Sequence, residues 1–135
     1  MKITALLVAS ILLAACAASD EKEDRREETA IADFIEVNEL TSVDSIRTLD
    51  RLSSSSVSDL YIIVSARRED FLLEYYSRCD RRFDGRVEPD IRQDLRALYP
   101  KLDTFRGCRI KAIYALEPGQ ADEIKELGRS VGGDR

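Results

Sequence analysis

Two apolar runs, Asp59–Ala66 (DLYIIVSA) and Asp70–Tyr76 (DFLLEYY), decide the fold of this chain. Both are rich in aliphatic and aromatic side chains that favour strands, and the charged segment Arg67-Arg68-Glu69 between them is typical of a turn. The pattern therefore predicts a β-hairpin. Because both runs are almost continuously apolar, we expect them in the centre of a sheet covered on both faces, at least in part by helices.

A third strong strand is predicted further along the chain. In Arg109–Leu116 (RIKAIYAL), basic residues alternate with apolar ones before the run becomes mainly apolar, and the preceding Arg106-Gly107-Cys108 is typical of a turn. Cys79 follows the second strand and Cys108 begins the third. A disulfide between these cysteines would fasten the ends of the two strands together.

Helices are predicted on either side of these strands. Ala30–Leu40 has helical apolar spacing, although its Val and Ile content also permits a strand from Phe34. A second helix is expected over Gln120–Leu127, ending at Gly128. A third is expected between Pro89 and Pro100, with one apolar face.

The remaining segments are predicted as a strand and a loop. Val43–Leu52 alternates loosely, and Ser53–Ser58 (SSSSVS) is predicted as a polar loop that joins it to the next strand. The fold class we predict is α+β, with a small, mainly antiparallel sheet, short flanking helices and one disulfide.

The N-terminus has the organisation of a bacterial lipoprotein signal. Lys2 gives it a positive start, Ile3–Leu13 is an apolar run, and Leu13-Ala14-Ala15-Cys16 has the pattern of a lipobox. The run is too short to span a bilayer. The alternative is an ordinary secretory signal with Cys16 incidental. We expect lipidation of Cys16 by acyl chains such as palmitate, which would anchor the mature chain to a membrane.

These features predict a cellular localisation and a domain organisation. By resemblance to lipoprotein sorting, Ala17 lacks the Asp that usually marks retention in the inner membrane, so we expect the periplasmic face of the outer membrane. We expect a signal peptide at 1–15, a lipidated cysteine and charged tether at 16–30, one α+β domain at 31–128, and a tail at 129–135.

Charge is unevenly distributed along the chain. The formal net charge is −5, yet the middle third is basic and rich in arginine. The candidate anion-binding residues there are Arg78, Arg81, Arg82, Arg86, Arg106 and Arg109. Interleaved acids make a surface of salt bridges the alternative interpretation. The acidic balance and the envelope address argue against nucleic acid as a partner.

Composition also limits the chemistry. The chain has no His and three cysteines, of which Cys16 is assigned to the anchor. In an oxidising compartment we expect Cys79 and Cys108 to form a disulfide. We therefore predict no metal site, no cofactor and no catalytic residue. A carboxylate-based hydrolase is the weaker alternative, and its candidate acids are Asp80, Asp84, Asp90, Asp94 and Asp103.

Several segments together resemble a known family. The most specific is D-x-x-R-G-C-R-I-x-x-I-Y over residues 103–114, accompanied by Ala32-Asp33-Phe34-Ile35 and Val87-Glu88-Pro89-Asp90. They resemble a family of small proteobacterial envelope lipoproteins that carries only a domain-of-unknown-function label. The resemblance supports the paired cysteines and the envelope address, and it implies no catalytic residue, ligand or partner.

The sequence thus favours a non-catalytic binding or accessory module of the cell envelope. Its expected partners are the membrane, through the lipid anchor, and an anionic envelope component or envelope protein met by the arginines. The alternative is a self-assembling or structural protein that associates through an exposed sheet edge.

Overall fold

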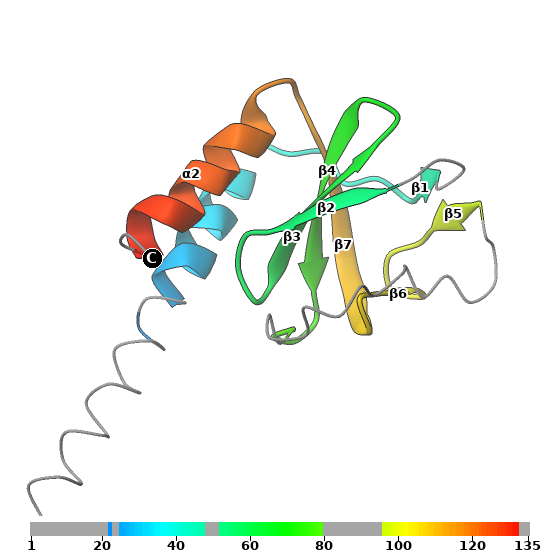
Figure 1. The fold of residues 1–135 in the computed structure, drawn as a ribbon, viewed down its shortest axis with the longest axis horizontal. Helices are drawn as coiled ribbons and strands as arrows, with labels where there is room; N and C mark the ends of the chain where they lie inside the picture. The colour runs from blue at the N-terminus through cyan, green and yellow to red at the C-terminus, as the bar shows by residue number, and fades with distance from the viewer. Residues whose placement is uncertain (1–21, 23–24, 48–51, 80–95, 133–135) are drawn as a thin grey trace, which may run out of the picture.

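A computed structural model describes residues 22, 25–47, 52–79 and 96–132. Its centre is a curled antiparallel sheet of five strands (Figure 1). In spatial order these strands are β2 (Ser53–Ser56), β3 (Tyr61–Ala66), β4 (Glu69–Tyr75), β7 (Cys108–Leu116) and β6 (Thr104–Phe105). A separate pair is formed by β1 (Ile46–Arg47) and β5 (Ala97–Leu98). The predicted α+β class is confirmed.

The predicted hairpin is present as β3 and β4. Ala66 pairs with Glu69, which leaves a loop of two residues, Arg67 and Arg68. Their φ angles are 52° and 72°. Two successive residues with positive φ form the type I′ turn that matches the twist of the flanking strands.

The third predicted strand is also confirmed, and it lies beside β4. It follows another two-residue turn, Arg106-Gly107, with φ angles of 53° and 75°. The disulfide joins Cys79, just beyond β4, to Cys108 at the start of β7, with 5.8 Å between the Cα atoms. A bulge between Glu74 and Tyr75 bends the β4–β7 ladder near this end.

Both faces of the sheet are covered, as predicted, but helices cover only one of them. The N-terminal helix (residues 25–37) and α2 (Gln120–Gly132) lie together on one face (Figure 1). Ile31 and Ile124 pack there with Leu72 from the sheet. On the other face, Ile46, Leu98 and Phe105 from the short strands pack with Leu73. Alternate residues of β4 therefore enter two separate apolar cores.

The serine segment was predicted wrongly as a loop. Ser53–Ser56 is the outer strand β2, paired with β3 from Ser53↔Ser65 to Ser56↔Ile62. The turn follows it, where the Ser58 hydroxyl oxygen accepts hydrogen bonds from the backbone N–H groups of Leu60 and Tyr61. An outer strand whose side chains are exposed or half-buried needs few apolar residues, so the ladder with β3 outweighs the low strand preference of serine.

The predicted strand over Val43–Leu52 is shorter than expected and has another partner. Only Ile46–Arg47 forms a strand, and it pairs with β5 instead of β3. Residues 48–51 lie outside the described part. The predicted helix between Pro89 and Pro100 is wrong at its C-terminal end, where Ala97–Leu98 is β5, and 80–95 lie outside the described residues.

The two other helices differ from the predicted bounds, and the N-terminal one ends at residue 37 instead of Leu40. The N-terminal helix already includes residues 25–29, within the predicted tether, and Glu27 is buried there. Helix α2 continues to Gly132 instead of ending at Gly128. A Cβ at Gly128 would lie 3.1 Å from Cγ1 and 3.2 Å from the carbonyl oxygen of Val57. The glycine therefore permits close packing of the helix rather than ending it.

Candidate functional site

The arginines of the predicted anion-binding cluster have separate partners in the structure. Arg78 forms an ion pair with Glu28 of the N-terminal helix, with 3.2 Å between Nη2 and Oε2. Arg106 donates a hydrogen bond of 2.8 Å to the Ser54 hydroxyl on β2.

Arg109 is the third described member of this cluster. Its guanidinium carbon lies 6.0 Å from the centre of the Tyr76 ring. Arg81, Arg82 and Arg86 lie outside the described residues. The disulfide brings the segments together, but the described arginines do not converge on one point, and their anion-binding role stays a prediction.

A pocket of about 610 Å³ opens at the other end of the sheet. Its apolar lining comes from Val43, Ile46, Ala66, Phe71, Ala115 and Leu116, and its polar lining from Ser45, Arg47, Arg67, Glu69 and Asp70. The pocket lies between β1 and the ends of β4 and β7 beside the β3–β4 turn. Ile46 and Phe71 also belong to the core on the face without helices.

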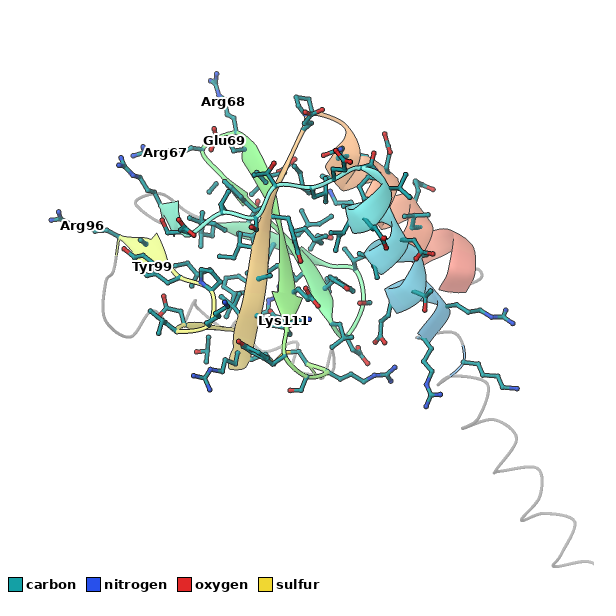
Figure 2. The ribbon with its side chains drawn as sticks, turned by 180° about the vertical axis from the view of Figure 1, so that it is seen from behind. Arg67, Arg68, Glu69, Arg96, Tyr99 and Lys111 are labelled. Atoms are coloured by element: carbon teal, nitrogen blue, oxygen red, sulfur yellow. A yellow bond between two sulfur atoms is a disulfide. The ribbon has the colours of Figure 1, made fainter. Side chains whose placement is uncertain are left out.

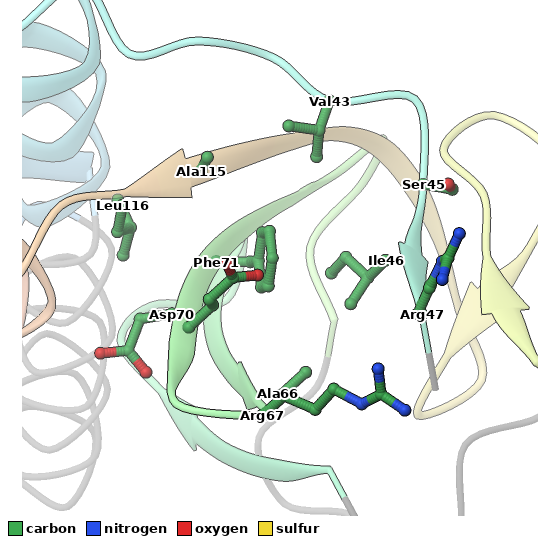
Figure 3. A pocket seen from close by; sticks show the side chains of 11 residues that line it. Val43, Ser45, Ile46, Arg47, Ala66, Arg67, Asp70, Phe71, Ala115 and Leu116 are labelled. Atoms are coloured by element: carbon green, nitrogen blue, oxygen red, sulfur yellow. The ribbon is translucent and has the colours of Figure 1, made fainter. Parts of the chain in front are cut away.

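Four charged residues line this pocket, two of them arginines and two of them acids, Glu69 and Asp70. Figure 3 shows the guanidinium groups of Arg47 and Arg67 on the same side, while Asp70 lies on the opposite side of Phe71. The Asp70 carboxylate accepts a hydrogen bond from the Ser65 hydroxyl, so one of its oxygens is already used within the sheet. Cationic groups thus lie together beside an apolar surface.

The turn that carries Arg67 is strained for its sequence. Type I′ turns favour Asn and Gly, because other residues meet steric resistance at positive φ. This chain places arginine at both positions, with Arg67 lining the pocket and Arg68 outside that lining. Figure 2 shows both arginines at the tip of the β3–β4 hairpin. Strained backbone conformations of this kind cluster at functional sites, where the function of the side chain outweighs the energetic cost of the strain.

A second polar group lies on the helix face of the sheet. The Lys111 ammonium is 2.7 Å from Oε1 of Glu74, and the Tyr114 hydroxyl donates a hydrogen bond of 3.2 Å to Oε2 of the same carboxylate. The hydrogen bond to Glu74 raises the pKa of Lys111. Burial, followed by the charge of Glu74, raises the pKa of Tyr114. This group stabilises the β4–β7 pairing and contains no unpaired nucleophile.

Three tyrosines are expected to ionise at higher pH than a free tyrosine. Burial is the largest cause that raises the pKa of Tyr61, Tyr75 and Tyr114. A group whose pKa is raised by folding stabilises the fold below its unfolded pKa and loses that contribution as pH rises. Stability should therefore fall above about pH 10. Phenolate absorbance during alkaline titration, alongside denaturant unfolding, checks this expectation.

Tyr75→Phe provides the control for that titration. It removes one phenol that ionises at high pH, together with the 3.2 Å hydrogen bond that its hydroxyl donates to the Phe105 carbonyl. If all five tyrosines of the chain titrate together near pH 10 in the folded protein, the buried environment is contradicted.

The structure bears on two further chemistries. Among the described residues, no group of three His, Cys, Asp or Glu side chains is placed to hold a metal ion. Asp103, the only described member of the candidate hydrolase acids, accepts a 2.8 Å hydrogen bond from the Tyr99 backbone N–H and holds the turn before β6.

No helix in the described ranges is long and apolar enough to cross a membrane.

The fold defines a small α+β domain, with a curled antiparallel sheet, two helices on one face, one disulfide and a pocket at one end. The chain belongs to a family of unknown function, DUF6491, whose family model matches residues 1–131. No curated protein and no solved structure matches the chain. The predicted resemblance to a family of unknown function is confirmed.

Proposed function

We propose that this protein is a lipid-anchored, non-catalytic binding module of the bacterial cell envelope, and that its pocket binds a small anionic molecule with an apolar part. The observation that supports this most is the placement of Arg47 and Arg67 together beside an apolar surface. The candidate site thus moves from the arginines around the disulfide to the opposite end of the sheet.

The size and lining of the pocket fit a small molecule. Ligand sites commonly have volumes of about 300–1,000 Å³, mainly apolar walls and a few polar groups that set orientation. At about 610 Å³, with Phe71 and Ile46 in its wall, this pocket has those properties. An acyl or similar apolar chain would lie along these side chains.

The charged side of the pocket favours an anion. Guanidinium groups recognise carboxylates and phosphates through charge-assisted, often paired hydrogen bonds. Arg47 comes from β1 and Arg67 from the β3–β4 turn, so the two cations are held by separate parts of the fold. The ligand class is therefore an amphipathic anion with a carboxylate or phosphate group.

The proposed localisation in the cell envelope is supported by the N-terminal segment and by the disulfide. The family match begins at residue 1 and so includes the segment with the lipobox pattern. The disulfide suits an oxidising compartment such as the periplasm. We propose the periplasmic face of the outer membrane, with Cys16 lipidated, and a family of proteobacterial envelope lipoproteins as its setting.

Dodecanoate, used as a probe and titrated by calorimetry, should bind the wild-type protein more tightly than variants that lack the pocket arginines. We expect Arg47→Ala and Arg67→Gly each to weaken binding about tenfold, the effect of losing one partly exposed charge-assisted hydrogen bond. Dodecyl phosphate should behave in the same way, and dodecanol, which has no charge, should be insensitive to both changes.

Arg68→Gly is the matched control for Arg67→Gly. Both substitutions relieve a residue with positive φ in the same turn, and only Arg67 lines the pocket. Both should therefore leave the domain at least as stable as the wild type. If the two variants bind dodecanoate equally, or if dodecanoate does not bind the wild type, the pocket is not the ligand site.

A further inference from the structure

We infer that the disulfide end of the domain is the face that lies against the membrane, with Tyr76 and Arg109 in contact with the bilayer surface. This inference rests on the lipid anchor of the proposed function and is independent of what the pocket binds. It assigns an interaction surface to residues outside the pocket.

Chain connectivity limits how far this face can lie from the lipid. Cys16 and Lys22, the first described residue of the chain, are six residues apart, and the described helix begins three positions later. A fully extended chain advances at most about 3.6 Å per residue, so at most about 22 Å separates the two Cα atoms. The start of the helix is therefore held near the bilayer, whatever path the connection follows.

The helix start is in turn attached to the disulfide end of the sheet. The Arg78–Glu28 ion pair joins the first turns of the helix to the residue preceding Cys79. Figure 1 shows the beginning of this helix and the end of β4 at the same end of the molecule. The described start of the helix, to which the anchor segment is connected, and the disulfide end thus lie on the same side of the domain.

The side chains at this end suit the interfacial region of a bilayer. Tyr76 is 52% exposed, and the Arg109 guanidinium lies over its ring. An aromatic ring with a polar tip, beside an arginine with an apolar stem, fits a boundary where apolar and hydrated surroundings meet. Two acids in the connection, at positions 20 and 21, oppose simple attraction to anionic lipid. We therefore assign attachment to the acyl chains and orientation to this pair.

This orientation places the pocket away from the bilayer. Strand β7 runs from Cys108 at the disulfide end to Leu116 in the pocket wall. Its nine residues cover about 26 Å at the usual rise of a strand. Figure 2 shows the same separation, with Arg67 at one end of the domain and Lys111 toward the other. The pocket would then take its ligand from the aqueous side.

Quenching of single tryptophans tests the orientation directly, because the chain has no tryptophan of its own. The full lipidated protein carries either Tyr76→Trp or Glu117→Trp, the latter at an exposed position just beyond the far end of β7. Each variant is reconstituted in phosphatidylcholine vesicles that contain brominated lipid. We expect quenching at position 76 at least several-fold greater than at position 117.

Equal quenching at the two positions, greater quenching at 117, or none at either would overturn the proposal. Intact mass must show acyl chains on Cys16, and an unmodified thiol would also overturn it. Cys16→Ser combined with Tyr76→Trp should lose the quenching. Quenching that persists in this variant would show that the lipid anchor does not hold this face at the bilayer. Dodecanoate binding, measured on the same samples, shows separately whether the pocket proposal holds.

Discussion

Replacing both Cys79 and Cys108 by serine is expected to lower the free energy of unfolding by about 3–4 kcal/mol. The bridge closes a loop between residues separated by 29 positions, and it joins the end of β4 to the start of β7. In the chain-entropy model a loop of this length restricts the unfolded chain by that amount. Since small domains have only about 5–15 kcal/mol in total, the loss would be a large fraction of the stability.

Urea unfolding of the wild type, with and without dithiothreitol, checks this expectation. The reduced wild type should match the double variant, and dithiothreitol should leave the double variant unchanged. A difference below about 1 kcal/mol would contradict the entropic account, because the unfolded chain without the bridge would then be almost as restricted as the bridged one.

The parts of the fold that were predictable from sequence are those fixed by local patterns. The runs that became β3, β4 and β7 contain enough adjacent apolar residues to identify them as central strands, and Gly107 marks the turn before β7. The disulfide followed from the count of cysteines and the expected compartment. None of these predictions depends on which segments, distant in sequence, lie side by side in the fold.

The predictions that failed depended on distant partners. The β2 serines have no strand preference of their own, and their ladder with β3 decides their conformation. Ile46–Arg47 becomes a strand because it pairs with Ala97–Leu98, some fifty positions away. No pattern around either dipeptide reveals the other, so the β1 wall of the pocket was not predictable.

The candidate site was missed for the same reason. Arg47 reaches the pocket only through the β1–β5 pairing, so its position beside Arg67 depends on long-range contacts. One local signal was available, since Arg67-Arg68 occupies a two-residue hairpin turn where Asn-Gly would be favoured. The arginine cluster was predicted instead from residues that lie close in sequence to Cys79 and Cys108. In the structure, Arg78, Arg106 and Arg109 have different partners.

Two adjacent leucines of β4 provide the sharpest test of the two-sided core. Leu72 packs with the helices, Leu73 packs on the opposite face, and both are fully buried. Truncation of a buried leucine to alanine typically costs about 2–5 kcal/mol, from lost burial and the remaining cavity. We therefore expect Leu72→Ala and Leu73→Ala each to destabilise the domain by that amount in urea unfolding.

Ser56→Ala, on the exposed outer strand, is the control and should change stability by less than about 0.5 kcal/mol. If Leu72→Ala is destabilising and Leu73→Ala is nearly neutral, the short strands β1, β5 and β6 do not close the second face. That result would also weaken the pocket, because Ile46 and Phe71 share a core with Leu73 and not with Leu72. Leu72→Ala protein that remains folded should accordingly bind dodecanoate like the wild type, since Leu72 does not line the pocket and, of the apolar lining residues, only Leu116 packs against the helix-side core.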